Sequence, residues 1–301
     1  MTHVHPIVHH PQYTVPLPPG HRFPMDKYQA VMLALTDQGA AHWSATHSPQ
    51  PIGQADAARV HGTTYAAQVF ASDLPPEATR RIGFAVTPAI VQRARLASGG
   101  TLLAARLALV HGCASNTAGG SHHAGPWGGS GYCVFNDVGI AATLLLANGE
   151  IESAAVLDLD VHQGDGTAAL FADEPRVVTA SIHCAANFPH RKVPGDLDVG
   201  LPIGTGDHAY LEALAQMLPK LLARKPALLF YNAGVDPHAD DRLGRLALTT
   251  AGLAERDRMV RTACGSARVP LVSVMGGGYG SDAAAIGRLH AQTIAVMAGV
   301  L

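Results

Sequence analysis

The sequence AAVLDLDVH, residues 154–162, joins a short apolar run to two carboxylates and an imidazole. An apolar run of this length that ends in polar residues predicts a buried strand, here over 154–159. Runs of the same kind predict three more strands, at 177–182, 228–233 and 271–275. These four runs are the expected framework of a sheet.

The segments between these strands carry apolar residues at helical spacing. In residues 210–222 apolar side chains recur every three or four positions, and Asp207 is a candidate cap for this helix. Strands that alternate with helices are typical of a mostly parallel sheet covered by helices on both faces. We therefore expect an α/β fold. Because no linker or repeat interrupts the 301 residues, we expect one domain over residues 1–301.

Composition and charge exclude several classes of protein. The net charge of −2 predicts no basic surface for direct nucleic-acid binding. The four cysteines are widely spaced without a CxxC pair, so we expect no disulfide framework and a reducing, cytoplasmic location. The sequence shows neither a secretory signal nor an uncharged apolar segment of the roughly 18 residues that span a membrane. A soluble protein is therefore expected.

Polar residues gather where each predicted strand ends. The first strand runs into the carboxylates and imidazole quoted above, and the others into 181–183, 232–236 and 276–279. The carboxyl ends of parallel strands meet at one edge of a sheet, where open α/β sheets bind ligands. One polar residue at such a place is typical of a turn or a helix cap. Four consecutive strand ends indicate a functional site.

Asp160 and His162 are the strongest candidates for metal ligands. Residues two apart in an extended chain project to the same side, so both can reach one ion, and Asp158 shares their face. One imidazole and carboxylates suit zinc or a similar divalent metal. Asp236, at another strand end, is the best candidate for a third ligand. The alternative is that Asp158 and Asp160 cap the next helix, although carboxylates in an apolar strand are costly without a positive partner.

His122 and His123 lie in the glycine-rich sequence GGSHHAG, residues 119–125, which permits close approach of the backbone to a ligand. Adjacent histidines near a metal can divide the work, one as proton-transfer catalyst and the other as electrostatic partner. The alternative is a histidine pair exposed on a surface loop. Four N-terminal histidines are expected on the surface: His3, His5, His9 and His10.

Tyr279 follows the run Gly276-Gly277-Gly278. A loop of this composition predicts either close approach of the backbone to a ligand or a loop that closes over it. The Tyr279 hydroxyl can then donate to an oxyanion that develops opposite a metal. The alternative is a glycine turn with a packed tyrosine.

Together, these motifs resemble the histone-deacetylase-like hydrolases of the arginase/deacetylase fold. Five blocks carry the resemblance in the family's order: GSHHA (120–124), GYCVFND (131–137), DLDVHQGDGT (158–167), NAGVDPH (232–238) and GGGY (276–279). HRFPMDKY, residues 21–28, is similar to the start of the class IV branch and its bacterial relatives. The resemblance covers nearly the whole chain and implies a zinc-dependent hydrolase that cleaves an acyl group from an amine.

Five positions match the family's catalytic residues. His123, with Asp165 as its carboxylate partner, matches the general base and acid. His122, partnered by Asp158, matches the electrostatic histidine, and Tyr279 matches the oxyanion-stabilising tyrosine. The resemblance thus implies attack by water without a covalent acyl-enzyme.

The resemblance also implies two ion sites. Asp160, His162 and Asp236 match the zinc (Zn2+) ligands, with Fe2+ as the alternative metal. Asp158 and Ser181, with backbone groups nearby, match a structural monovalent-cation site that is often occupied by potassium (K+).

Four residues match the substrate channel. Gly131, Tyr132 and Phe188 fall where the family admits acyl-lysine, with the two rings as aromatic walls. Leu243 falls near the position where acetylpolyamine hydrolases tend to carry an acidic residue at the rim. One departure is Gln163, which stands where many members have a second histidine and which is similar to the class IV branch.

The expected substrate is an acylated lysine of a protein or an acylated small amine. The uncharged Leu243 favours acyl-lysine over the acetylpolyamine alternative. A ureohydrolase of the arginase type, which uses two manganese ions, fits the Asp-x-Asp-x-His order and the Tyr279 loop less well. A non-enzymatic binder of acyl-amines would lack a catalytic residue, and every matching position is present here.

Overall fold

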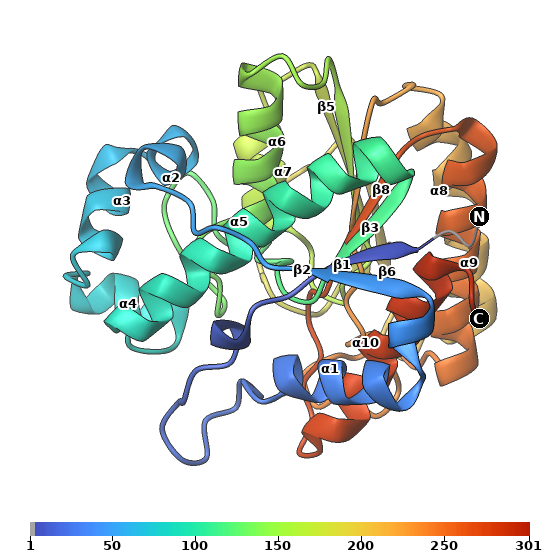
Figure 1. Ribbon diagram of the computed structural model, residues 1–301, viewed down its shortest axis with the longest axis horizontal. Coiled ribbons are helices and arrows are strands. Elements are labelled where there is room, and N and C mark those ends of the chain that lie inside the picture. Colours follow the sequence, from blue (N-terminus) through green and yellow to red (C-terminus); the bar gives the residue numbers. More distant parts are fainter. Residues whose placement is uncertain (1–3) are drawn as a thin grey trace.

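The computed structural model describes residues 4–301 (Figure 1). Its centre is a single sheet with strand order β2-β1-β3-β8-β7-β4-β5-β6, and each neighbouring pair is parallel. The eight strands found in residues 4–301 are β1 His5–Val8, β2 Ser44–His47, β3 Cys113–Asn116, β4 Ala154–Asp158, β5 Val177–Cys184, β6 Leu197–Leu201, β7 Leu229–Asn232 and β8 Leu271–Val274. The expected α/β fold with a parallel sheet is confirmed.

The four strands predicted from apolar runs all form, as β4, β5, β7 and β8, with ends within two residues of those expected. The sequence did not indicate the other four strands. β1, β2 and β3 have four residues each, and β6 at the sheet edge alternates between exposed and more buried positions. Runs this short carry too little periodicity to stand out from loops.

His5 is not on the surface, as the sequence suggested, but is buried in β1. Its Nε2 lies 2.9 Å from the hydroxyl of Ser115 in the neighbouring strand β3. His9 is half-buried, and its Nδ1 lies 2.8 Å from the hydroxyl of Thr117. His3 lies outside the described residues. The expectation failed because it treated the N-terminal segment as a surface loop, whereas this segment contributes a strand.

Helices cover both faces of the sheet, with α5, α6 and α7 on one side and α8, α9 and α10 on the other (Figure 1). Successive residues of β4 point to the two layers, because side chains alternate along a strand. Leu157 belongs to the apolar cluster that includes α8, α9 and α10, and Val156 belongs to the cluster that includes α5, α6 and α7. The α-helices found in residues 4–301 are α1 Lys27–Asp37, α2 Gln54–His61, α3 Thr63–Phe70, α4 Pro76–Ile82, α5 Pro88–His111, α6 Asp137–Ala147, α7 Asp165–Phe171, α8 Asp207–Leu222, α9 Thr250–Ala267 and α10 Ala283–Ala298.

The helix predicted at 210–222 forms as α8, but Asp207 is not its cap. Gly206 occupies the cap position, and Asp207 is the first helical residue. The Asp207 carboxylate accepts hydrogen bonds from the backbone N–H and the hydroxyl of Thr249, at 2.8 and 2.7 Å. Asp207 thereby ties the start of α8 to the start of α9, where Thr249 is the cap.

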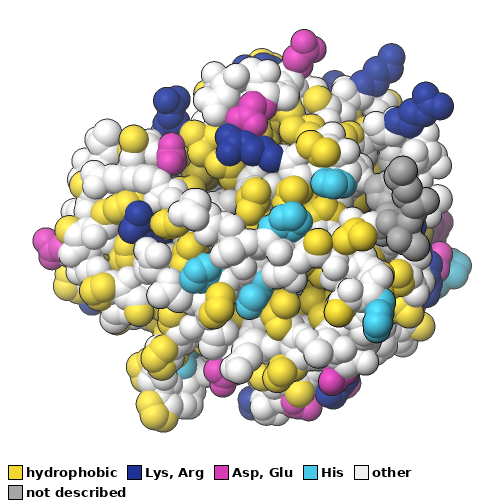
Figure 2. Space-filling view, in the orientation of Figure 1, with side chains coloured by type: hydrophobic (Ala, Val, Ile, Leu, Met, Phe, Trp, Pro, Cys, Tyr) yellow, Lys and Arg dark blue, Asp and Glu magenta, His cyan; other side chains and the backbone are white. Residues whose placement is uncertain are grey.

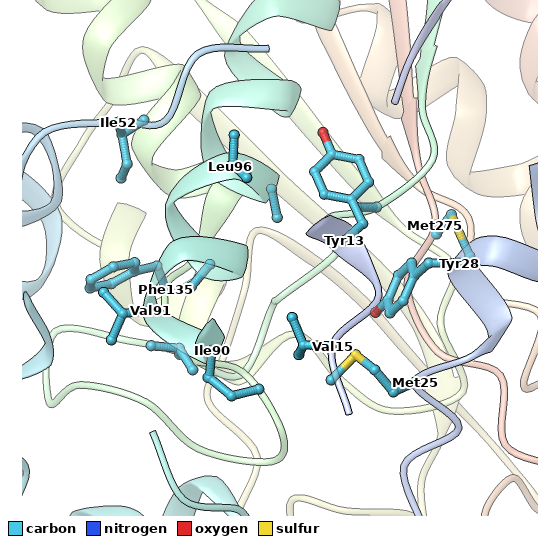
Figure 3. Packing of buried hydrophobic residues seen from close by; sticks show 14 of the residues in the cluster. Tyr13, Val15, Met25, Tyr28, Ile52, Ile90, Val91, Leu96, Phe135 and Met275 are labelled. Atoms are coloured by element: carbon cyan, nitrogen blue, oxygen red, sulfur yellow. The ribbon is translucent and has the colours of Figure 1, made fainter. Parts of the chain in front are cut away.

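A further apolar cluster supports the sheet beneath the polar strand ends. Tyr28 from α1 and Met275, which directly precedes the glycine loop, both belong to it (Figure 3). Helix α1 packs closely on α10, since a Cβ at Gly287 would lie 2.7 Å from Ala30. Through Met275, the start of the glycine loop is part of this packed apolar cluster.

On the face shown in Figure 2, several histidine side chains are exposed near β1 and the edge strand β2, and charged side chains are scattered. Among residues 4–301, none of the helices has the length and apolar character to cross a membrane.

Candidate active site

The polar segments that follow β3, β8, β7 and β4 meet because these four strands are consecutive in the sheet. The order β3-β8-β7-β4 places the segments after these strands side by side, and parallel pairing puts all of them at the same edge. The histidine pair follows β3, the glycine loop follows β8, Asp236 follows β7, and Asp160 follows β4.

Asp160, His162 and Asp236 form one buried group whose ligand atoms all lie within 4.8 Å of one another. The Nδ1 atom of His162 is 3.0 Å from Asp160 Oδ1 and 3.1 Å from Asp236 Oδ2. Backbone amides hold both carboxylates, since Val161 N–H donates to Asp236 at 2.9 Å and Gly277 N–H donates to Asp160 at 2.6 Å.

This group fits a divalent metal. Asp160 and Asp236 are almost completely buried, and among residues 4–301 their ion-pair partners are only histidines. Two carboxylates in such an environment are costly unless a cation joins them. One imidazole nitrogen and two carboxylate oxygens make a ligand set that suits a catalytic zinc site.

Two carboxylates favour the charged form of His122. Its Nδ1 lies 2.7 Å from Asp158 Oδ2, and its Nε2 lies 3.8 Å from Asp160 Oδ1. Burial opposes the charge on the ring, but the two carboxylates outweigh burial and raise the pKa of His122 to about 9. The Asp158 carboxylate is thus used by His122 and lies beside the metal-binding group without belonging to it.

His123 is held in its neutral form. Burial is the main cause and the charge of His122 adds to it, so the pKa of His123 falls to about 4 although Asp165 acts against the shift. Nδ1 of His123 lies 2.6 Å from Asp165 Oδ1. With Nδ1–H donated to this carboxylate, Nε2 keeps a lone pair that can accept a proton.

Tyr279 lies close to the metal-binding group and to the histidine pair. Its ring centroid is 6.1 Å from that of His162, and it lines one small cavity, of about 20 Å³, together with His122, His123 and Asp160. Burial raises the pKa of Tyr279 above its usual range, so the hydroxyl keeps its proton at neutral pH.

The glycine loop before Tyr279 is closely packed, and its closure over a ligand stays a prediction. Gly276, Gly277 and Gly278 are buried. The Gly276 carbonyl accepts from the Lys27 ammonium at 3.0 Å, and the Gly277 carbonyl accepts from Val235 N–H at 3.0 Å. Here the glycines permit close packing of the backbone.

The histone deacetylase domain model matches residues 21–297 of this chain. The chain belongs to the histone deacetylase family. An uncharacterized protein of Picosynechococcus sp. is 46% identical over 92% of this chain and 93% of its own length. A probable deacetylase of Archaeoglobus fulgidus is 35% identical over 70% of this chain and 62% of its own length.

A solved structure shows the same fold. The HD domain of HDA15 superposes on 99% of this chain and 89% of its own with a TM-score of 0.83, at 22% sequence identity. At this identity the likeness concerns the fold, and it agrees with the sheet order and helix layers described above.

The residues expected in the substrate channel of this histone deacetylase family member lie beside His123 and Tyr279. Phe188 packs edge-on against His123 with centroids 4.8 Å apart, and it faces Gly131, where a Cβ would lie 3.2 Å from the Phe188 ring and 2.6 Å from His123. Tyr132 stacks on Phe84 with centroids 6.1 Å apart, its ring centroid is also 6.1 Å from that of Tyr279, and it lines the small cavity of His123 and Tyr279. Glycine is therefore required at position 131, which also has a φ of +51°.

Asp158 and Ser181, the two side chains expected at a monovalent cation, are direct partners in the register of β4 and β5. The Ser181 hydroxyl lies 3.0 Å from His183 Nδ1. Gln163 points away from the metal-binding group, since its amide donates to Val193 O at 2.8 Å and to Asp198 at 2.9 Å.

Several residues that hold this site were not predicted from the sequence. The Asn232 amide donates to Asp158 at 3.0 Å, and the Asp137 carboxylate accepts from Ser121 N–H at 2.8 Å, beside the histidine pair. Lys27 is fully buried, with its ammonium 5.5 Å from the Tyr279 ring centroid. Asn232, Asp137 and Lys27 all lie in the motifs quoted from the sequence, and this was the one signal that could have indicated them.

Proposed function

We propose that this chain is a zinc-dependent deacylase that hydrolyses the amide of acyl-lysine, with acetyl-lysine as the simplest substrate. The observation that carries the proposal is the shared cavity of His123, held neutral, and Tyr279, held protonated, beside Asp160 of the metal-binding group. A proton acceptor and a proton donor next to a metal ligand set are the parts that amide hydrolysis by water requires.

The residues of the chain divide the reaction among them. Nε2 of His123 takes a proton from the attacking water and later delivers it to the leaving amine, while Asp165 keeps Nδ1 protonated. The Tyr279 hydroxyl donates to the oxyanion of the tetrahedral intermediate, and the positive charge of His122 stabilises the same oxyanion. The products are a carboxylate, acetate in the simplest case, and a free amine.

Asp160, His162 and Asp236 are the residues that would hold the zinc ion. When bound, zinc would supply Lewis acidity that polarises the acyl carbonyl and lowers the pKa of water from its ordinary high value toward roughly 7. The same three residues suit Fe2+ as the alternative metal.

A ureohydrolase activity is less well supported, because residues 4–301 bring together one three-ligand group and a two-manganese centre needs more ligands. For acetylpolyamines, the uncharged Leu243 is half-buried and its carbonyl accepts from Asn187 at 2.7 Å, so this position offers no charge to a polyamine. We further propose that residues 1–301 act as one catalytic domain and that Asp158 and Ser181 contribute to a potassium site.

The test is hydrolysis of a panel of acyl-lysine peptides and acetylpolyamines by protein loaded with a defined metal. We expect acetate release from an acetyl-lysine peptide, and no turnover by His123→Ala with metal content unchanged, since a base acts on protons and not through coordination. Faster turnover of the polyamines would assign the alternative activity. Wild-type rates from His123→Ala would show that another residue is the base.

A further inference from the structure

Asp241 holds the backbone of Tyr279. One carboxylate oxygen, Oδ2, accepts from the Tyr279 N–H at 2.6 Å, and the N–H of the next residue, Arg242, donates to the Tyr279 carbonyl at 2.8 Å. The other oxygen, Oδ1, accepts from the N–H groups of Leu243 and Gly244, both at 2.8 Å. Both backbone polar groups of Tyr279 are thus bound by one short turn.

The same turn is joined to the metal-binding group at two points. The Asn187 amide donates to the Leu243 carbonyl at 2.7 Å and lies 3.4 Å from Nε2 of His162. Gly244 packs directly on the backbone of Asp236, since a Cβ at Gly244 would fall 2.0 Å from the Asp236 carbonyl oxygen. The turn therefore connects Tyr279 to two metal-ligand candidates, to His162 through Asn187 and to Asp236 through Gly244.

The glycine loop needs such a support. Gly276 and Gly278 have φ values of +67° and +150°, a region that side chains rarely allow, so the chain before Tyr279 has little intrinsic stiffness. Donors to an oxyanion act only when they are placed to within a fraction of an ångström. A largely buried carboxylate that receives three backbone N–H groups is a rigid anchor, because charge-assisted hydrogen bonds of this kind are strong.

We propose that Asp241 is a positioning residue that sets the Tyr279 hydroxyl relative to Asp160, His162 and Asp236. It acts through the backbone of Tyr279 and does not touch the substrate. The inference rests on the proposed function, in which the Tyr279 hydroxyl stabilises the oxyanion.

Asp241→Asn is the informative variant, and Asp240→Asn is its matched control. The asparagine Oδ1 can still accept from the turn, but its NH₂ group then opposes the Tyr279 N–H, donor against donor. Asp240 is the preceding residue, its side chain is 91% exposed, and its substitution makes the same change of charge. Should Asp241→Asn fail to fold, Asp241→Ser keeps a turn-forming hydroxyl that is too short to reach Tyr279.

Activity on an acetyl-lysine peptide is the first measurement. Because removal of one oxyanion donor costs about 10²–10³ in kcat, we expect a misplaced donor in Asp241→Asn to cost about tenfold to a hundredfold, with KM little changed. Asp240→Asn should match the wild type. In a Tyr279→Phe background, Asp241→Asn should cost almost nothing more, because the group it positions is gone. Equal rates for the two asparagine variants, or losses that multiply with Tyr279→Phe, would overturn the proposal.

Hydrogen exchange of the metal-free protein is the second measurement, and it does not depend on turnover. The Tyr279 amide should exchange faster in Asp241→Asn than in the wild type or Asp240→Asn, since it loses its acceptor. Unchanged exchange would refute the anchoring role even if activity fell. An inactive wild type, or a fully active Tyr279→Phe, would instead contradict the proposed function, and the exchange data would still decide whether Asp241 anchors the loop.

Discussion

Replacing Asp165 with asparagine changes the proposed general base without changing its size. In the wild type the Asp165 carboxylate only accepts, 2.6 Å from His123 Nδ1, so it keeps the proton on Nδ1 and leaves Nε2 free. The asparagine NH₂ group can donate to Nδ1 and so favours the tautomer with the proton on Nε2. A ring in that tautomer cannot accept a proton from water.

The size of the effect follows from the role that is lost. General base catalysis contributes about 10²–10⁴ in rate, so we expect kcat to fall by that factor, about 3–5 kcal/mol in the barrier. KM should change little, because the side chain of Asp165 is buried behind His123. Asp165 begins α7, and loss of its charge from the first turn should cost only about 0.3–1 kcal/mol of stability.

The assay is acetate release from an acetyl-lysine peptide, with metal content and thermal unfolding measured on the same samples. Asp173→Asn is the control, because it removes one exposed carboxylate just beyond the other end of α7. A folded, metal-loaded Asp165→Asn protein with wild-type kcat would refute the assignment of the His123–Asp165 pair as general base.

Four further outcomes are expected. Asp236→Ala should lose both bound metal and activity, and full metal retention by elemental analysis would remove Asp236 from the ligands. Tyr279→Phe should lower kcat by about 10²–10³ with unchanged metal content and thermal stability, whereas a fully active variant would show that the ring only packs. Because the pKa of His123 is lowered to about 4, kcat/KM should hold from pH 7 to 5 and fall near pH 4, and a midpoint near 6.5 would contradict this. The same shift should make the free energy of unfolding decrease as pH falls from 6.5 through 4, since only the unfolded His123 gains a proton in that interval.

Much of the site was predictable because its chemistry lies in short local patterns. Asp160 and His162 are two residues apart after an apolar run, and this spacing alone places them on one face. The structure does bring Asp236 to them, and it pairs His122 with Asp158 and His123 with Asp165. Their roles in the reaction remain predictions.

Asp241 shows what the sequence did not indicate. It stands beside Asp240 in a polar stretch with no periodicity, where both acidic residues resemble ordinary surface positions. Only the folded chain separates them, with the Asp240 side chain 91% exposed and the Asp241 carboxylate bonded to three backbone amides. The same holds for His5, which the sequence placed on the surface and which is buried in β1.

By itself, the sequence determined that buried strands end in carboxylates, imidazoles and glycines, because apolar runs and the residues after them are local properties of the chain. It also determined the family, through motifs that the matched region of 21–297 confirms. Only the tertiary structure decided the strand order β3-β8-β7-β4, since hydrogen bonding between strands does not depend on their distance along the chain. That order makes neighbours of residues more than a hundred positions apart, such as Gly277 and Asp160, and thereby turns separate strand ends into one site.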